Sequence, residues 1–390
     1  MTEAQPGPAR GPVPPDRPPH TGVGTYAWAM IITVVLAVVL GAALSRVTVD
    51  DVVYYPGPVY DTLGAIDDTT VVQMDEDLPT YPTDGDLYFT TIRLAGGPGD
   101  DLNVWEWVRA RLDPSTTIVP REEVYPENVT AQEVREQNTS LMQHSQQDAA
   151  VVALRADGIE VPEKIMVAQV IKDAPADGVL EVDDQILTVE GDAMDDTETV
   201  RSRLQEVEPG ATATMTLVRD GKTITLDVPT TKDEESGRTI VGVYLAPDYD
   251  MPYDVEVSAG NVGGPSAGLM FALAIYDTIT PGSLTNGLSF AGTGTISGNG
   301  TVGPIGGIAQ KMWASDQAGA QVFLAPADNC DEVVERTPDG LTVVPVSTFD
   351  EAKGYVEEVA AAGTDELSSL DLPTCQQVLA ERSDGATSTG

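Results

Sequence analysis

The sequence is poor in the side chains that serve most metal sites and many catalytic sites. Its 390 residues include only two histidines, His20 and His144, and two cysteines, Cys330 and Cys375. These small numbers exclude most zinc sites, iron–sulfur clusters and haem attachment, so we expect neither a metal nor a cofactor. His144 has no partner histidine or cysteine and is interpreted as a structural or surface residue. Chemistry in this chain would therefore depend on serine, lysine or carboxylate groups.

Basic residues are also scarce. The chain has 21 lysines and arginines against 62 aspartates and glutamates, which gives a formal charge of −41. A sequence-independent nucleic-acid binder needs clustered cations to neutralise phosphates, so we expect no nucleic-acid partner. With so many acids, close carboxylate pairs arise by chance, and we interpret the acids as a solvated surface. The hydrophobic share of 41% is typical of a globular protein, and the length predicts two or three domains.

One long apolar run is present near the N-terminus. Residues 27–44 are almost purely apolar, and valines would lie on every side of a helix there. At 1.5 Å per residue the run crosses most of a bilayer core of roughly 30 Å, so it predicts a transmembrane helix over residues 27–45. A cleaved signal peptide is the alternative, because residues 41–43 are small, but the run exceeds the roughly 7–15 apolar residues of such signals.

Residues 1–26 are rich in proline and cannot pack a core, which predicts a disordered tail. This tail carries Arg10 and Arg17, whereas only Arg46 follows the apolar run before Arg93. The asymmetry predicts a cytoplasmic N-terminus. We therefore expect a single-pass protein of the cell membrane in which the chain from about residue 46 onward, with its catalytic domain if it has one, is extracytoplasmic.

Residues 46–155 have the pattern of an N-terminal extracytoplasmic module of mixed α/β character. Strand-like runs broken by turns come first, and two helices follow, one at residues 102–112 and one from Thr130 to about residue 153. The second helix opens with a capping box formed by Thr130 and Glu133. Nothing in this segment indicates a function.

Residues 156–232 are β-rich. A strand at 165–171 is followed by Ala-Pro-Ala-Asp-Gly at 174–178, Asp-Gln-Ile-Leu at 184–187, a helix at 197–207 and a hairpin joined at Asp220-Gly221. This order resembles a PDZ domain of the bacterial protease type, which takes an extended peptide as an added strand beside a helix. The resemblance implies a peptide groove lined by Val161, Ile165, Met166 and Val167. A non-binding structural β-module is the alternative.

The residues best suited to chemistry lie between residues 236 and 362. Gly-Gly-Pro-Ser-Ala-Gly at 263–268 precedes residues 269–276, which are apolar on every face and predict a buried helix. Ser266 would then stand at the start of this helix, where unpaired backbone N–H groups and the helix dipole favour a developing oxyanion. A role for Ser266 as a simple helix N-cap is the alternative.

A glycine-rich segment over residues 293–308 leads to a second helix, which bears Lys311. The chain has six lysines, and we single out Lys311 because it lies among apolar neighbours after Pro-Ile-Gly-Gly. A lysine with a pKa of ~10.4 cannot accept a proton at neutral pH, but burial could lower that pKa by roughly 3, a free-energy change of ~4 kcal/mol. Such a lysine could activate Ser266 without any histidine.

Together these two segments resemble the proteolytic domain of the Lon family. Gly-Pro-Ser-Ala-Gly at 264–268 matches the segment around the nucleophile, and Gly-Pro-Ile-Gly-Gly-Ile-Ala-Gln-Lys at 303–311 matches the segment around the base. The resemblance implies that Ser266 is the nucleophile, Lys311 its general base and Thr293 a hydrogen-bond partner of the lysine, with Gly264 and Ala267 in support. Gly263 departs from the pattern, because many Lon enzymes have an acidic residue there.

The Lon ATPase is not expected in this chain, because no Gly-x-x-x-x-Gly-Lys-Ser/Thr motif occurs in it. The whole arrangement resembles the PDZ-containing Lon-like serine proteases of Gram-positive, actinobacterial type, in which Gly263 also fits. The resemblance implies an α+β multidomain protein. Its parts would be the transmembrane helix, the mixed α/β module, the β-rich PDZ-like domain, an α/β Lon-type proteolytic domain at 236–362 and a C-terminal tail at 363–390.

We therefore expect a membrane-anchored, ATP-independent serine endopeptidase. Its PDZ-like domain would recruit polypeptides that are unfolded or have accessible termini, and a homo-oligomer is compatible with the sequence. The alternative is a catalytically silent scaffold that binds envelope proteins. A Ser–Lys hydrolase of other amides is disfavoured, because the Ser-x-x-Lys motif of penicillin-binding proteins is absent. A disulfide between Cys330 and Cys375 would tie the tail to the proteolytic domain, and two free thiols are the alternative.

Overall fold

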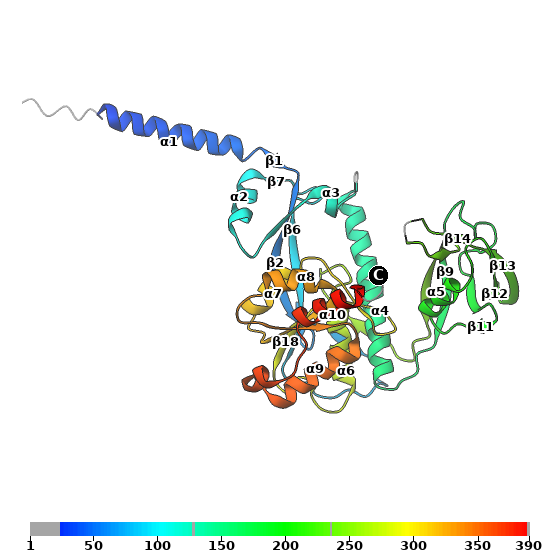
Figure 1. Cartoon of the computed structure of the whole chain (residues 1–390). Coiled ribbons are helices and arrows are strands. Elements are labelled where there is room, and N and C mark those ends of the chain that lie inside the picture. The colour runs from blue at the N-terminus through cyan, green and yellow to red at the C-terminus, as the bar shows by residue number, and fades with distance from the viewer. Residues whose placement is uncertain (1–23, 127–128, 235, 388–390) are drawn as a thin grey trace, which may run out of the picture.

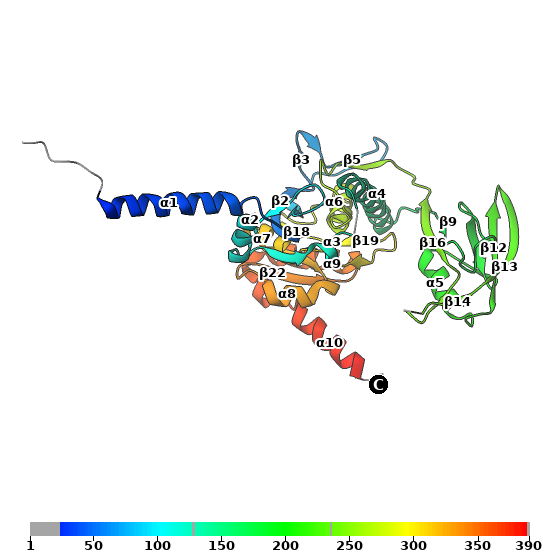
Figure 2. The same cartoon turned by 90° about the horizontal axis from the view of Figure 1, so that it is seen from above.

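The computed structural model describes residues 24–126, 129–234 and 236–387 (Figure 1). Most of the predicted tail of residues 1–26 lies outside these ranges, so its disorder stays a prediction. The described chain consists of a long N-terminal helix, a mixed α/β body and a β-rich domain beside the body (Figures 1 and 2).

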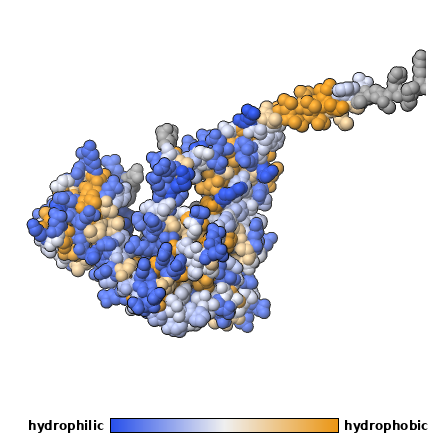
Figure 3. All heavy atoms as spheres, turned by 180° about the vertical axis from the view of Figure 1, so that it is seen from behind, coloured by the Kyte–Doolittle hydropathy of each residue, from blue (hydrophilic) through white to orange (hydrophobic). Residues whose placement is uncertain are grey.

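The first helix, α1 (Thr25–Leu44), stands away from the body as a continuous apolar rod (Figures 1 and 3). None of its residues is buried against the rest of the chain. Within the described ranges it is the one helix that is long and apolar enough to cross a membrane, judged by length and composition alone. The predicted span of residues 27–45 therefore coincides with a helix.

The body is built on a six-stranded sheet of order β22-β21-β18-β6-β2-β8. The strands are β2 (Asp51–Asp61), β6 (Asp86–Ala95), β8 (Thr117–Pro120), β18 (Ser289–Gly292), β21 (Val322–Pro326) and β22 (Thr342–Val346). Strands β6, β18, β21 and β22 are parallel, whereas β2 runs antiparallel to its neighbours β6 and β8. One sheet therefore combines strands from both sides of the PDZ-like segment.

Strand β6 joins the two halves of the chain, and this overturns one expected boundary. Its residues Leu87 and Phe89 are fully buried, and Leu87 lies opposite Phe290 of β18. A buried strand needs a hydrogen-bonded neighbour on each edge, and β6 has β2 on one side and β18 on the other. Residues 46–155 are therefore not a separate module but half of the body. The hydrophobic pattern of β6 predicts a strand but does not predict which strands pair with it.

Helices cover both faces of this sheet. One face carries α4 (Ala131–Ala156), α6 (Gly268–Ile279) and α9 (Phe349–Ala362), and the other carries α7 (Ile308–Gln317), α8 (Cys330–Arg336) and α10 (Cys375–Thr387). Along β21, Leu324 packs with the first group, while Phe323 and Ala325 pack with the second, as the alternation of a strand requires. Residues 269–275 of α6 are apolar on every side and fully buried, because the sheet and α4 enclose this part of the helix.

Shorter elements complete the body. They are β1 (Thr48–Val49), β3 (Ala65–Ile66), β4 (Thr69–Thr70), β5 (Val72–Met74), β7 (Leu102–Asn103), α2 (Val104–Leu112), α3 (Arg121–Val124), β17 (Val255–Val257), β19 (Thr295–Ile296), β20 (Val302–Gly303) and the 3-10 turns η1 (Ala327–Asn329) and η2 (Thr364–Ser369). Helix α4 begins with the predicted capping box of Thr130 and Glu133.

The β-rich domain has its own sheet and its own core, separate from the body (Figures 1 and 2). Its elements are β9 (Glu163–Val170), β10 (Gln185–Val189), β11 (Asp192–Ala193), α5 (Thr197–Gln205), β12 (Thr212–Arg219), β13 (Lys222–Pro229), β14 (Thr231–Lys232), β15 (Thr239–Ile240) and β16 (Val243–Tyr249). The sheet order is β13-β12-β10-β9-β16, with the predicted hairpin at Asp220-Gly221. Because β16 completes the sheet, the domain extends past the expected end at residue 232.

The C-terminal segment is attached to the body by a disulfide. Cys330 on α8 is bonded to Cys375 at the start of α10, and both sulfur-bearing residues are buried. Of the two alternatives that the sequence left open, the structure contains the disulfide.

Candidate active site

Ser266 lies in a tight loop that ends where α6 begins. Gly264 in this loop has φ of +88°, a left-handed conformation that favours glycine. The helix starts at Gly268 with Ala267 as its N-cap, so Ser266 is not the capping residue. A Cβ atom at Gly268 would lie 2.5 Å from the hydroxyl of Ser145, which explains the second glycine of the motif.

Lys311 lies on α7 and points into the same space. Only 2% of it is exposed. Its Nζ donates hydrogen bonds to Ser266 Oγ at 2.8 Å, to Thr293 Oγ1 at 2.9 Å and to the carbonyl of Thr90 at 3.1 Å. None of the ion pairs among the described residues involves this lysine. The structure therefore brings the predicted pair into direct contact, with Thr293 beside it as expected.

Burial decides the protonation state of Lys311. Desolvation disfavours the ammonium form and lowers the pKa of Lys311 to about 7. In a substantial fraction of the protein molecules, Lys311 is then neutral at pH 7. A neutral amine can accept the proton of a serine hydroxyl. The three oxygen acceptors offset part of the cost of the charged form. This arrangement can perform nucleophilic chemistry without histidine.

The carbonyl that belongs to Ser266 is held by two donors. Thr293 donates its hydroxyl hydrogen to Ser266 O at 2.8 Å, and the Gly294 amide donates to the same oxygen at 2.9 Å. The single hydroxyl of Thr293 thus donates to the serine residue and accepts from the lysine. By contrast, the amides of Ser266 and Ala267 have no protein acceptor among the described residues.

Helix α4 holds the other side of the loop. The buried Ser145 donates its hydroxyl hydrogen to Pro265 O at 2.9 Å, and the Gly264 amide donates to Asn138 O at 2.9 Å. No sequence pattern pointed to Ser145, Asn138 or Thr90, because each lies more than a hundred residues before Ser266 and belongs to no motif. Only the packing of α4 and β6 against the C-terminal half brings them to the site.

The same packing accounts for Gly263. A Cβ atom at this position would lie 3.0 Å from Cβ of Asn138, closer than side-chain carbons normally approach. A cavity of about 510 Å³ adjoins this stretch, between α4 and the chain that leads to the serine loop. It is lined by Arg135, Asn138, Thr139, Met142, Gln143, Gln146 and residues 256–263.

The residues expected to line the peptide groove are not free to do so. Strand β9 is paired with β10 on one edge and β16 on the other, so it cannot accept a further strand. Val161, Ile165 and Val167 are buried in cores, and Met166 is paired on both sides. The expected groove at these residues is therefore wrong. The sequence shows that β9 is a strand but not that it is an interior one.

The open edge of this sheet next to a helix is β16. A cavity of about 550 Å³ lies between β16, the start of α5 and residues 297–301 of the body. Leu245, Pro247 and Tyr249 of β16 line it, opposite Asp196 and Glu198 of the α5 end. Tyr249 donates its hydroxyl hydrogen to Asp148 of α4 at 3.1 Å, and burial raises the pKa of Asp148 to about 6.

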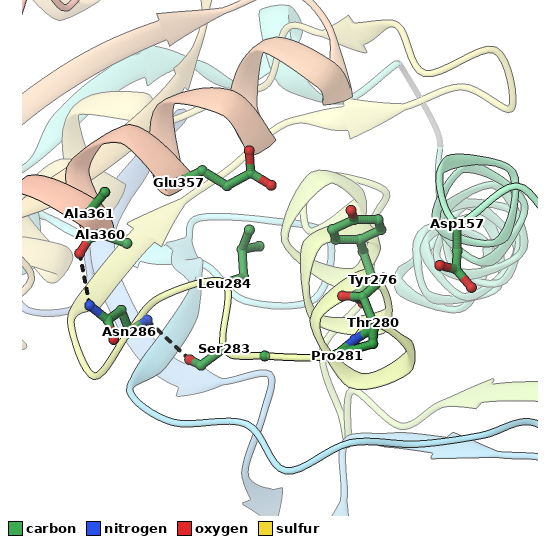
Figure 4. Close-up of a pocket in the computed structure, with 11 residues that line it drawn as sticks. Asp157, Tyr276, Thr280, Pro281, Ser283, Leu284, Asn286, Glu357, Ala360 and Ala361 are labelled. Atoms are coloured by element: carbon green, nitrogen blue, oxygen red, sulfur yellow. Dashed lines mark hydrogen bonds between the residues drawn. The ribbon is translucent and has the colours of Figure 1, made fainter.

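Another cavity, of about 510 Å³, lies away from Ser266, between the end of α6 and α9 (Figure 4). Tyr276, Leu284 and Glu357 are among its lining residues, and Asn286 donates a hydrogen bond across it to Ala360 O at 3.0 Å. Its lining contains no residue of the Ser266 and Lys311 pair.

Within the described ranges, no group of three or more His, Cys, Asp or Glu side chains is placed to hold a metal.

Two family descriptions match this chain. Residues 130–230 match the PDZ domain, and residues 248–356 match the Lon protease (S16) C-terminal proteolytic domain. Lon protease 2 of Bacillus subtilis is 35% identical over 102 residues, which are 25% of this chain and 18% of that protein. The archaeal Lon protease of Archaeoglobus fulgidus is 36% identical over 100 residues, 25% of this chain and 16% of that protein. The chain thus spans less than a fifth of these relatives.

Among solved structures, the PDZ domain of an SdrC-like protein from Listeria monocytogenes is 23% identical, with a TM-score of 0.20. The likeness covers 21% of this chain and 86% of that one. The two family matches confirm the domain types predicted from the motifs. The chain combines a PDZ domain with a Lon-type proteolytic domain, the domain that carries peptidase activity in the Lon serine proteases.

Proposed function

We propose that this chain is a membrane-anchored, ATP-independent serine endopeptidase that uses Ser266 and Lys311 as its catalytic pair. The observation that carries the proposal is the 2.8 Å contact between Lys311 Nζ and Ser266 Oγ at a lysine whose pKa is lowered by burial. A lysine that served only structure would be paired with an acidic side chain. A buried lysine without such a partner is costly, and it is kept where its neutral form is useful.

The chemistry follows from the positions of the two side chains. Neutral Lys311 takes the hydroxyl proton while Ser266 Oγ attacks the scissile carbonyl carbon. The free amides of Ser266 and Ala267 receive the oxyanion that develops. The lysine then gives its proton to the leaving amine as the C–N bond breaks. Water repeats the sequence on the acyl-enzyme and restores the serine.

Membrane anchoring is the second part of the proposal. Helix α1 has 20 residues and is about 30 Å long, which equals the thickness of a bilayer core. The disulfide between Cys330 and Cys375 supports an oxidising compartment for the body. Together with Arg10 and Arg17 before the helix, this favours a cytoplasmic N-terminus and an extracytoplasmic catalytic domain.

Recruitment of polypeptides is the third part. An extended peptide would add to the open edge of β16 with its side chains against α5. At the end of this groove the peptide would meet residues 297–301 of the body, which connect β19 to β20 a few residues after Thr293. The groove would thus deliver a bound chain toward the proteolytic domain.

Two substitutions test the catalytic part on the full chain in detergent or bilayers. Ser266→Ala and Lys311→Ala, made separately, should each abolish hydrolysis of an unfolded casein-type substrate. Ser140→Ala on the exposed side of α4 and Lys222→Ala on the PDZ domain are matched controls that should retain it. Hydrolysis that persists in both active-site variants would contradict the proposal and favour the silent scaffold.

The recruitment part has an independent test. In the Ser266→Ala background, Leu245→Asp on β16 should weaken binding of a fluorescent unfolded peptide, measured by anisotropy. Thr223→Asp places the same charge on β13, the opposite edge of the sheet, and should leave binding unchanged. Equal affinities of the two variants would argue against the β16 groove while leaving the catalytic pair untouched.

A further inference from the structure

Helix α2 (Val104–Leu112) has an exposed apolar face that the fold does not use. Trp105 is 48% exposed and Leu112 is 80% exposed, and their spacing of seven residues puts them on the same side of the helix. The opposite side packs on the body. There Ala110 is buried, and Trp107 donates its indole hydrogen to Asp51 at 2.8 Å. Two tryptophans on one short helix therefore have different environments.

The exposed face lies beside the end of α1. Trp105 Nε1 donates a hydrogen bond to the carbonyl of Gly41 at 2.9 Å. Gly41 is three residues before the end of α1 at Leu44, or about 4.5 Å along its axis. Figures 1 and 2 agree that α2 adjoins this end of α1.

The connection between the two helices is short and structured. After α1 ends, Thr48 and Val49 of β1 pair with β7, the strand that directly precedes α2. The amide of Val104 also donates to Val47 O at 3.1 Å. The body therefore cannot move far from the end of α1 without breaking these bonds, and α2 stays at the level of Gly41.

That level corresponds to a particular layer of a bilayer. If α1 spans the hydrocarbon core, its end lies at the core boundary, and Trp105 lies in the interfacial layer. Tryptophan favours this layer because its ring is apolar while its N–H is polar. Arg109 is exposed and lies four residues after Trp105, on the same side of α2, and Arg46 is exposed just after α1 ends. Long arginine side chains at this level are suited to lipid phosphates.

We propose that α2 is an interfacial helix that rests on an anionic phospholipid surface. Trp105 and Leu112 enter the boundary between headgroups and acyl chains, and Arg109 and Arg46 contact phosphates. This rests on the proposed membrane anchoring by α1 and goes beyond it. A body held at both α1 and α2 does not swivel freely about its anchor, so the central sheet keeps a fixed orientation to the membrane.

Tryptophan quenching by brominated lipid tests this on the full chain. The protein is reconstituted in phosphatidylcholine and phosphatidylglycerol vesicles that contain phosphatidylcholine brominated near the headgroup. Of the four tryptophans, Trp28 on α1 and Trp105 should be quenched. Trp105→Phe should therefore reduce the quenched emission by about half, while Trp107→Phe on the inward side of the same helix should leave it unchanged.

The outcomes separate the two proposals. If both variants lose the same amount of quenched emission, or neither loses any, α2 does not rest on lipid. If alkaline carbonate extracts the wild-type chain from the vesicles, the anchoring by α1 is wrong and the interfacial role of α2 is wrong with it. A chain that stays in the vesicles but has a solvent-exposed Trp105 contradicts the α2 proposal alone. Thermal unfolding of the two variants verifies that both remain folded.

Discussion

The Nζ atom of Lys311 donates a hydrogen bond to the backbone carbonyl of Thr90, 221 residues earlier in the chain, at 3.1 Å. Thr90 belongs to β6, the strand that joins the two halves of the sheet. The lysine is therefore positioned from both halves, by Thr90 on one side and by Thr293 and Ser266 on the other. The environment that lowers its pKa exists only once β6 is paired with β18.

The pH dependence of hydrolysis should report Lys311. Its pKa is lowered to about 7, and the neutral form is the active base. We expect kcat/KM to rise about tenfold per pH unit below this value and to level off above it. Steady-state rates between pH 5.5 and 9 measure the profile. A flat profile over this range would exclude a lysine base.

The same burial predicts how stability responds to removal of the lysine. The pKa of Lys311 is lower in the folded chain than its unfolded value of ~10.4. Below about pH 7 the lysine is buried in its charged form, so the wild type is there at its greatest disadvantage in stability against Lys311→Met. As pH rises from 7 towards 10, Lys311 loses its proton in the folded chain but keeps it in the unfolded chain. The buried charge is then removed, and the wild type regains stability. Lys311→Met should therefore raise the unfolding temperature more at pH 6 than at pH 9. An equal increase at both pH values would show that the lysine is not desolvated.

Thr293 should matter for orientation through its single hydroxyl. Thr293→Val removes both the acceptor for Lys311 and the donor to Ser266 O, whereas Thr293→Ser keeps them. A hydrogen bond to a charged or reacting group contributes roughly 1.5–3 kcal/mol, so the valine variant should lose about 10- to 100-fold in kcat. The serine variant should stay within a few fold. Similar rates for the two variants would show that this hydroxyl is not used.

Ser145 should act as a positioning residue. Its hydrogen bond to Pro265 O fixes the peptide group that directly precedes Ser266, and its hydroxyl does not touch the lysine. Ser145→Ala should lower kcat by about tenfold with little change in KM, because substrate binding is not altered. Ser140→Ala, on the exposed side of the same helix, is the control. A change in KM alone, or a loss of thermal stability without a loss of kcat, would contradict this role.

Gly263 should be required because α4 is close. Gly263→Ala would place a methyl group against Cβ of Asn138, and displacement of the serine loop should reduce kcat. Removing the opposing Cβ with Asn138→Gly in the same chain should restore part of the activity, at the cost of some helix stability. The chain that carries both Gly263→Ala and Asn138→Gly should therefore have a higher kcat than the chain with Gly263→Ala alone. Additive losses would mean that another contact constrains this glycine.

The sequence alone determined the local features of this protein. The apolar run that forms α1, the capping box of α4, the Asp220-Gly221 hairpin and the two glycine-rich motifs depend on residues close to one another in the chain. Their interactions are set by side-chain period, turn chemistry and helix propensity. For this reason Ser266 and Lys311 could be singled out from their motifs, and the family resemblance that these motifs carry implied Thr293 and the PDZ and Lon-type domains.

Tertiary structure decided which strands became neighbours and what surrounds the site. The hydrophobic pattern of β6 or β9 is the same whether an edge is open or paired, because pairing is made by backbone groups that every residue carries. The pairing of β6 with β18 made residues 46–155 half of the body, and the pairing of β9 on both edges moved the open edge to β16. The same long-range packing placed Thr90 at the lysine and Ser145 at the serine loop.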